Sequence, residues 1–245
     1  MEWRDEGIVL AARRHGERDA VASLLTFEHG RHAGLVRGGA GRRLWPLLQP
    51  GNRLECAWRA RLSEHLGGFT LEPMRLHVAG FLEDPLRLAA VASACALLEA
   101  VLPERDPHPP LYAALLTLLG RMGEADDWPA DYVRFELLLL AELGYALDLT
   151  SCAVTGSSED LAFVSPRSGR AVSSGAAEPW ASRLLPLPPF LIEAVDADDA
   201  QIVDGLRLAG HFLRRHILEP ADRPMPVARD RLSSLFQERS QETSA

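Results

Sequence analysis

The chain has 245 residues, of which 47% are hydrophobic and 24% charged, a composition typical of a folded globular protein of one or two domains. Its longest nearly apolar run, residues 88–98, is about half of the roughly 20 residues that a helix needs to cross a bilayer. The first six residues include three acids and no apolar core, so we expect neither a signal peptide nor a transit peptide. Composition therefore excludes a disordered chain and an integral membrane protein, and predicts a cytoplasmic one.

The charge is divided unevenly along the chain. The net charge is −8, and all 26 basic residues are arginine. Residues 1–80 carry 12 arginines against 9 acids, whereas residues 81–245 carry 14 arginines against 25 acids. A basic N-terminal part therefore precedes an acidic part, and every permanent cationic contact of a side chain must be made by a guanidinium group.

Residues 1–80 are predicted to form a small β-barrel. Five strand-length stretches alternate with turn signals, and Leu54, Cys56 and Trp58 alternate along one face of the fourth stretch. The stretches are Gly7–Ala12, Ala20–Phe27, Arg31–Arg37, Arg53–Leu62 and Phe69–Val78. Five short strands separated by glycine-containing turns predict a five-stranded OB-type barrel, an architecture that binds nucleic acids.

Residues 81–245 are predicted to form a helical domain, which makes the chain an α+β protein of two domains. Asp84 can cap a helix that starts at Pro85. Further helices are predicted over residues 111–122 and 130–147, from Asp198 onward, and over residues 227–238. Residues 151–185 interrupt this pattern with the strand-like run Leu161–Val164 and a proline-rich segment, so we expect an inserted hairpin there.

Catalytic motifs are missing from the sequence. There is no Gly-x-x-x-x-Gly-Lys phosphate loop and no Gly-x-Ser-x-Gly elbow, and the lack of lysine excludes a lysine Schiff base. No pair of carboxylates stands out among the 34 acidic residues, and Glu136 is expected at the solvated edge of its leucine-rich helix. Cys56, Cys95 and Cys152 are too few and too widely spaced for a disulfide framework. We therefore predict a protein that is not an enzyme and has no cofactor.

The clearest chemical signal is a group of arginines around a glycine-rich loop, with a tryptophan two residues beyond the last of these arginines. Guanidinium groups suit phosphates, and an exposed indole offers a surface on which any base can stack. The group comprises Arg31, Arg37, Arg42, Arg43 and Trp45, around the loop of residues 38–41, and the run Trp58-Arg59-Ala60-Arg61 on a later strand. A structural interpretation is equally consistent with the composition: Trp58 and Trp45 would fill the barrel, and the arginines would keep it soluble.

The order of several segments resembles one known family. The matching segments are Trp3 with Gly7-Ile8-Val9-Leu10, Gly16-Glu17-Arg18-Asp19-Ala20 through His29-Gly30-Arg31, Leu35-Val36-Arg37-Gly38-Gly39-Ala40, Leu48-Gln49-Pro50-Gly51, and Arg134-Phe135-Glu136 through Leu149-Thr150-Ser151-Cys152. By the order and spacing of these segments, residues 1–215 resemble the DNA repair protein RecO family, the bacterial recombination mediators.

The resemblance implies an N-terminal OB barrel and a helical domain that carries a small zinc-ribbon-like insertion. The family insertion has a Cys-x-x-Cys … Cys-x-x-Cys pattern, but here Cys152 stands alone and Thr155 occupies the position three residues on. One thiol cannot supply the four ligands of a structural zinc site. We therefore expect a degenerate, cysteine-poor hairpin over residues 151–185 that holds no metal.

The resemblance also implies a function in DNA damage repair and DNA recombination. A protein of this family would bind single- and double-stranded DNA, anneal complementary strands coated with single-stranded DNA-binding protein (SSB), and together with RecR help to load RecA. It would work in the cytoplasm, at the nucleoid, and would have no membrane as a partner. The residues that we expect to contact DNA are Arg13, Arg14, Arg31, Arg37, Arg42, Arg43 and, as a stacking residue, Trp45.

The helical domain of the family receives the acidic, hydrophobic C-terminal tail of SSB. Such a tail calls for an apolar pocket beside a guanidinium, and Arg134 with Leu138 one helical turn on fits that description. Alternatively, Arg134 is a surface residue that pairs within its own helix with Glu136 or Asp131.

Three other classes of protein remain possible. A generic OB-fold binder of single-stranded nucleic acid, such as RNA, would bind strands without mediator activity. A cytoplasmic adaptor whose barrel binds only protein would show no salt-dependent affinity for oligonucleotides. A hydrolase would need a catalytic constellation in a deep pocket.

Overall fold

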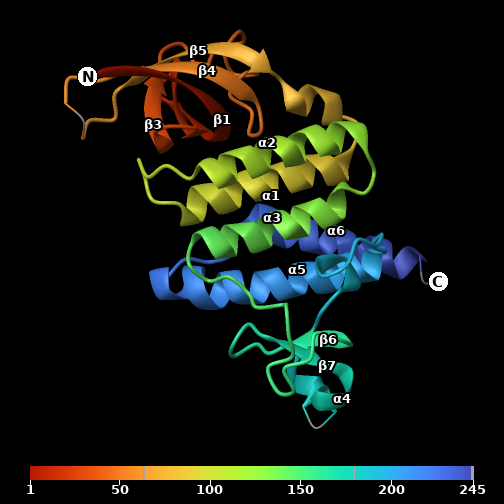
Figure 1. Ribbon diagram of the computed structural model, residues 1–245. Coiled ribbons are helices and arrows are strands. Elements are labelled where there is room, and N and C mark those ends of the chain that lie inside the picture. The colour runs from red at the N-terminus through yellow and green to blue at the C-terminus, as the bar shows by residue number, and fades with distance from the viewer. Residues whose placement is uncertain (63, 179, 244–245) are drawn as a thin grey trace. The chain divides into compact units, whose positions relative to one another are not determined.

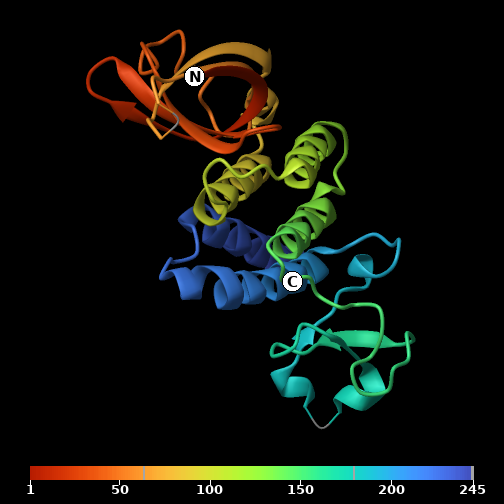
Figure 2. The same cartoon turned by 60° about the vertical axis from the view of Figure 1, so that its left-hand side comes forward.

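The structure, a computed structural model, describes residues 1–62, 64–178 and 180–243 and divides into two compact units (Figures 1 and 2). The first unit comprises Met1–Glu124 with Pro226–Arg229, and the second comprises Ala125–Met225 with Asp230–Ala245. The two helices that follow the barrel in sequence therefore belong to the unit of the barrel. Among the described residues, no helix has both the length and the apolar character that crossing a membrane requires.

Five strands close into a barrel in the order β1-β2-β3-β5-β4 (Figure 2). Neighbouring strands are antiparallel except β3 and β5, which are parallel. Their bounds are Glu2–His15 (β1), Asp19–Thr26 (β2), Gly30–Val36 (β3), Arg53–Arg59 (β4) and Gly68–Arg75 (β5). The five predicted strands are all present. β1 is longer than predicted because its first half pairs with β4, from Glu2 opposite Arg59, and its second half pairs with β2, as far as His15 opposite Asp19.

The predicted alternation along β4 is confirmed. Leu54, Cys56 and Trp58 are buried in the barrel, whereas Glu55 and Arg59 are exposed. Trp58 is only 2% exposed, and its indole Nε1 donates a hydrogen bond to the backbone oxygen of Leu66 at 3.0 Å. A buried indole needs such an acceptor, so Trp58 is a core residue, as the structural interpretation of the sequence expected.

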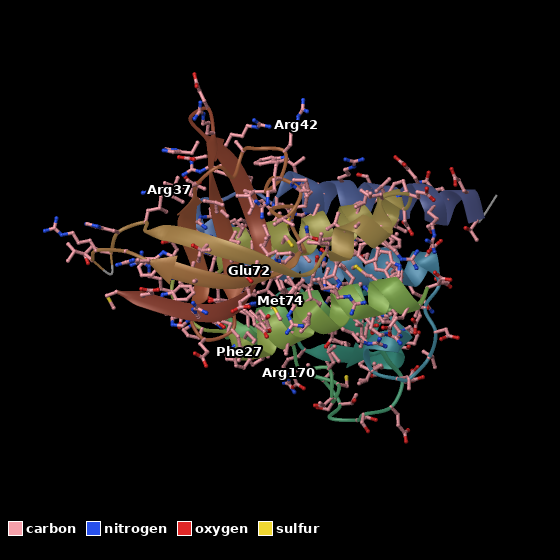
Figure 3. The ribbon with its side chains drawn as sticks, turned by 90° about the horizontal axis from the view of Figure 1, so that it is seen from above. Phe27, Arg37, Arg42, Glu72, Met74 and Arg170 are labelled. Atoms are coloured by element: carbon pink, nitrogen blue, oxygen red, sulfur yellow. The ribbon has the colours of Figure 1, made fainter. Side chains whose placement is uncertain are left out.

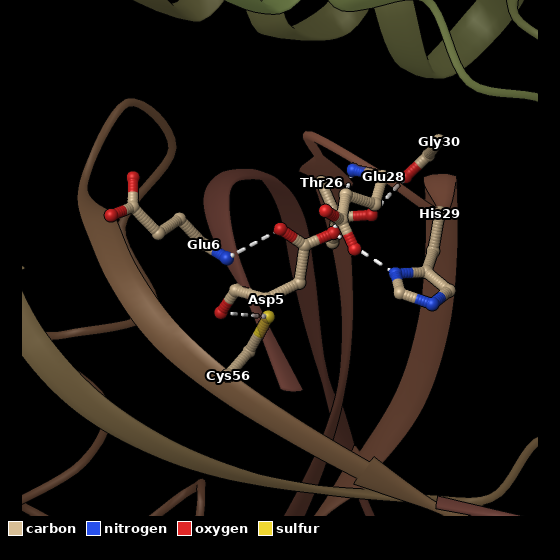
Figure 4. Close-up of polar contacts among 7 residues, drawn as sticks. All are labelled: Asp5, Glu6, Thr26, Glu28, His29, Gly30 and Cys56. Atoms are coloured by element: carbon tan, nitrogen blue, oxygen red, sulfur yellow. Dashed lines mark hydrogen bonds and ion pairs between the residues drawn. The ribbon is translucent and has the colours of Figure 1, made fainter. Parts of the chain in front are cut away.

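A buried carboxylate fixes the turn between β2 and β3 to β1 (Figure 4). Asp5 Oδ1 accepts from the backbone nitrogen of Glu6 at 2.7 Å, and Oδ2 accepts from that of Glu28 at 2.8 Å. Oδ2 also lies 3.0 Å from His29 Nδ1, and the His29 ring stacks on Trp3 at 4.1 Å. The Asp5 side chain thus contacts two residues of the turn, Glu28 and His29. These contacts help to keep β2 and β3 in register with β1.

Two helices pack in the same unit as the barrel: α1 spans Pro85–Val101 and α2 spans Pro109–Glu124, after the short 3-10 helix η1, His77–Phe81. The predicted cap is confirmed, because the Asp84 side chain accepts from the backbone nitrogens of Leu86 and Arg87. Polar contacts tie α1 to the strands: Ser23 Oγ donates to Glu99 Oε2 at 2.5 Å.

Two histidines are buried in this unit as neutral side chains. His32 is 4% exposed and His77 5%, and neither ring nitrogen of His32 has a hydrogen-bond partner. Burial lowers the pKa of each from 6.5 to about 4. Between these two values the unfolded chain binds protons that the folded chain does not, so the free energy of unfolding falls as the pH drops below 6.5.

We expect each histidine to lower the free energy of unfolding by about 2 kcal/mol between pH 7 and pH 5. His32→Phe, which keeps an aromatic ring beside Trp3, Trp58 and Phe69, should remove its share of that slope. Urea unfolding at the two pH values measures the difference. A variant with the wild-type pH dependence would show that His32 does not titrate in this way.

The second unit contains helices α3 (Trp128–Glu142) and α5 (Asp199–Leu213) and all but the first residues of α6 (Val227–Thr243). α3 ends five residues before the predicted end, because Gly144 adopts a left-handed φ of 88° and the Tyr145 backbone nitrogen bonds back to Leu140 at 2.8 Å. Glu136 is fully buried, so its expected position at a solvated edge is wrong. It lies on the same stripe as Tyr132 and Leu140, one turn away on either side, and both are buried.

The insertion between α3 and α5 forms a three-stranded sheet in the order β7-β6-β8 (Figure 1). Its strands are β6 (Leu161–Val164), β7 (Ala171–Ser173) and β8 (Leu185–Pro186), with the short helix α4 (Ser174–Ala177) beside them. Cys152, Val172 and Ala177 form a small buried cluster, against which Leu161 and Phe163 pack. Apolar packing therefore contributes to holding this element together.

Candidate nucleic-acid interface

A groove of about 760 Å³ runs along the barrel where β3 meets β5. The two strands share a single parallel pair, Leu35 opposite Gly68, so the sheet is open on either side of this contact. We call this the barrel groove; its lining residues are Leu35, Val36, Arg37, Arg43, Leu44, Arg59, Gly67, Gly68, Phe69, Thr70 and Leu71. Its lining is apolar apart from Thr70 and three arginines, two at the loop after β3 and one on β4.

Two of these arginines are presented by the loop that the sequence singled out. Arg37 follows β3 directly, and Gly38 then turns the chain with a φ of 68°. The loop is held by its backbone: the Gly38 nitrogen donates to Asp19 Oδ1 at 2.8 Å, and the Trp45 nitrogen donates to the Gly41 oxygen at 3.0 Å. The arginines of the loop are therefore carried by an ordered segment.

The side chains of Arg37, Arg42 and Arg43 are exposed, and none makes an ion pair with another described residue. Arg37 and Arg42 point away from the barrel into solvent (Figure 3). Of the three, Arg37 and Arg43 line the barrel groove and Arg42 does not. A guanidinium without an acidic partner can contact a phosphate without first breaking an ion pair.

Arg59 belongs to the run Trp58-Arg59-Ala60-Arg61, which the sequence grouped with the arginines suited to phosphate contact, but it was not among the residues expected to contact DNA. Its side chain is 81% exposed, and its nearest carboxylate is that of Glu2 at 3.9 Å, itself 60% exposed. Strand alternation indicates that Arg59 is exposed, because Trp58 points into the barrel and the next residue on a strand points outward.

Arg13, Arg14 and Trp45 form a second group near the end of β1. Both arginines are exposed, and the guanidinium carbon of Arg14 lies 5.1 Å from the centre of the Trp45 ring. Trp45 is half-buried and packs against the barrel core. The Trp45 indole therefore packs against the core and also makes a cation–π contact with Arg14. Only its exposed part is left for stacking on a base.

Arg31 is held apart from the groove. Its side chain is 14% exposed; Nε donates to the backbone oxygen of Leu102 at 2.9 Å, and a terminal nitrogen lies 3.3 Å from Glu99 and 3.6 Å from Glu104. These contacts link β3 to the end of α1 and the loop after it. Arg31 therefore has a structural role within the unit.

Arg134 lies at a pocket of about 210 Å³ in the second unit. Its guanidinium donates to Asp131 Oδ1 at 3.0 Å and to the backbone oxygen of Phe190 at 2.8 Å, and lies 5.6 Å over the Phe190 ring. The alternative interpretation, a pair with Asp131, is thus observed. Leu138 is half-buried one turn on but does not line this pocket, which Arg239 and four aspartates do.

Comparisons with known proteins agree over most of the chain. Residues 1–75 match the family model described as Recombination protein O N terminal, and residues 82–223 match Recombination protein O C terminal. The chain is 52% identical over 237 residues to the DNA repair protein RecO of Cereibacter sphaeroides ATCC 17023, covering 96% of this chain and 99% of that protein. The chain belongs to the RecO family of DNA repair proteins. The RecO protein of Rhodospirillum centenum is 53% identical over 233 residues, covering 94% of this chain and 93% of that one.

As a RecO protein the chain belongs to DNA repair and recombination. The next question is whether its side chains could hold a metal ion. Among the described residues, no group of three or more histidines, cysteines or acids is placed to hold a metal ion. The Cys152 sulfur accepts a hydrogen bond from the Ser173 backbone nitrogen at 3.3 Å and is buried in the insertion. The thiol that remains at this position thus packs in the core of the small sheet.

Proposed function

We propose that this RecO-family chain is a mediator of homologous recombination that binds single- and double-stranded DNA and anneals complementary strands coated with SSB. The barrel groove carries the proposal, because Arg37, Arg43 and Arg59 line it together with apolar side chains. Guanidinium groups that neutralise phosphates give affinity for any sequence, and the bases stay free to pair. The proposal takes the five-stranded barrel to be of OB type and the insertion to be a degenerate zinc-ribbon-like hairpin.

The mediator would make and break no covalent bond. It would act in the cytoplasm at the nucleoid, and with RecR it would help RecA to replace SSB on single strands. The test is the rate of DNA-dependent ATP hydrolysis by RecA on SSB-coated single strands, with RecR and with or without this protein. Faster onset of hydrolysis only when both RecR and this protein are present supports the proposal. An onset that this protein leaves unchanged, while it still binds bare strands, would leave a generic OB-fold binder.

We further propose that the acidic C-terminal tail of SSB binds at Arg134 and Leu138. The Arg134 side chain is 44% exposed although it pairs with Asp131, so it can still donate to a second carboxylate. Arg134→Ala should weaken binding of a fluorescent peptide with the SSB tail sequence about tenfold, the effect of losing one charge-assisted contact.

Arg183→Ala is a suitable control for the peptide measurement, because it removes an exposed arginine from a different segment of the same unit. Leu138→Ala should weaken the peptide through lost apolar contact while leaving the Arg134 contacts intact. If both the Arg134 and Leu138 variants bind the peptide as the wild type does, the tail binds elsewhere.

A further inference from the structure

A basic patch interrupts the acidic surface of the second unit. That unit carries 10 arginines against 19 acids over Ala125–Met225 and Asp230–Ala245. Within it, the turn between β6 and β7, which carries Arg167 and Arg170, contacts the end of α5 through His211 and Arg215. We call the following residues the helical-unit patch: Tyr145, Arg167, Arg170, His211, Arg214 and Arg215.

The turn that carries two of these arginines is fixed against the helix. The backbone oxygen of Pro166 lies 3.1 Å from His211 Nε2 and accepts from Arg215 at 3.2 Å. Gly169, with a φ of 69°, lies so close to Leu147 that an added Cβ would be only 3.0 Å from that side chain. Arg167 and Arg170 are exposed on this turn and are therefore held at a defined place beside Arg215.

Little acidic charge neutralises these arginines. Arg167 makes no ion pair with another described residue. Arg170 lies 3.3 Å from Asp148, and Arg214 lies 3.7 Å from Asp230, with both side chains of the latter pair more than half exposed. Exposed pairs of this kind are weak, so a stronger anion can replace them.

The helix has an unusual geometry at the same place. α5 passes directly into a π-helical turn, η4, that spans Arg214–Leu218. Such turns are rare and are found frequently at functional sites, because they re-aim side chains at a cost in helix stability. Here the turn presents Arg214 and Arg215.

An exposed aromatic ring, that of Tyr145, lies against the end of the same helix. Tyr145 is 42% exposed and stacks on His216 at 4.9 Å and 17°, and His216 in turn lies parallel to the buried Phe212 at 5.9 Å. The Tyr145 ring is therefore supported from beneath. Arginines together with a supported, exposed ring are the combination that single-stranded nucleic acids bind, through phosphates and through base stacking.

We propose that the helical-unit patch binds the phosphodiester backbone of a second single strand, with Tyr145 stacking on a base. The inference rests on the proposed annealing function, in which two strands must be held by one protein, and it adds a site for the strand that the barrel groove does not hold. An acidic peptide is the competing ligand, but it would not use the stacked ring.

The test counts short oligothymidylates bound per chain by native mass spectrometry at low ionic strength. Three variants are compared with the wild type: Arg167→Ala/Arg214→Ala, which spares the contacts to Pro166; Tyr145→Ala; and Arg37→Ala/Arg43→Ala/Arg59→Ala in the barrel groove. Arg183→Ala serves as a control outside the patch. Annealing of bare complementary strands is measured for each variant.

We expect two oligothymidylates per wild-type chain and one per chain in both arginine variants. Both patch variants should keep the tighter site within about twofold. Tyr145→Ala should anneal about fivefold more slowly, in line with one lost stacking contact, and Arg167→Ala/Arg214→Ala should slow annealing through lost phosphate contacts. Two outcomes would overturn the second binding site while leaving the proposed mediator function intact. One is that the patch variants still bind two strands per chain. The other is that the wild-type chain binds one strand, and that only the groove variant loses it. A wild type that binds no strand would instead overturn the proposed function.

Discussion

Arg37→Ala/Arg43→Ala/Arg59→Ala should weaken binding of single-stranded DNA on the order of a hundredfold, with little dependence on sequence, if each exposed phosphate contact contributes about 1 kcal/mol. The three side chains line one groove, so they are placed to contact successive phosphates of one strand. Loss of three contacts should also reduce the slope of log affinity against log salt by about 2. Fluorescence anisotropy of a labelled oligonucleotide over a series of salt concentrations measures both quantities.

A matched control is available on the neighbouring strand. Arg75 is exposed at the end of β5, four residues beyond the last groove residue of that strand. Arg75→Ala removes the same charge as Arg59→Ala, and should change affinity and salt slope much less. Equal effects of the two single variants would indicate a general electrostatic attraction, and an unchanged salt slope in the triple variant would place the DNA site elsewhere.

Gly30→Ala should destabilise the first unit by about 3–5 kcal/mol. Gly30 has a φ of 66°, and a Cβ there would lie 2.1 Å from the backbone oxygen of Asp106. Because the obstacle is backbone, the segment bridged to β3 through Arg31 and Glu104 would have to move. The hydrogen bond from Thr26 Oγ1 to the Gly30 oxygen would be strained as well. Urea unfolding followed by tryptophan fluorescence measures the loss.

Gly16→Ala separates the cost of the left-handed backbone from the cost of the close approach to Asp106. Gly16 has a similar φ of 63°, but no heavy atom lies within 4 Å of a Cβ built there. It should therefore show only the cost of a left-handed backbone, about 1 kcal/mol. If Gly30→Ala costs no more than Gly16→Ala, the close approach to Asp106 does not constrain the fold.

Local signals predicted most of the elements. Alternation of apolar residues identified β4, and Asp84 followed by Pro85 identified the start of α1, because both signals act within a few residues. The full length of β1 could not be predicted, since residues 2–6 are strand only because β4 pairs with them. The buried position of Glu136 likewise depends on the side chains packed around its helix, which a sequence pattern does not give.

The candidate site was only partly predictable for the same reason. Arg37 and Arg43 could be found from the glycine loop that carries them. Arg31, from the same group, is held by Glu99 and Glu104, more than 65 residues away in the chain, and no local pattern announces such partners. Arg59 joins the groove because β3 and β5 meet beside it, which is a property of the barrel closure.

The measurement that tests the central claim most directly is the annealing rate of complementary oligonucleotides precoated with cognate SSB, followed by fluorescence quenching without nucleotide. The wild-type protein should anneal coated strands faster than they anneal alone, and the triple variant of the barrel groove should lose most of this acceleration. Coated strands that anneal no faster with the wild-type protein than without it, while the protein still binds bare strands in a salt-dependent way, would contradict the mediator function.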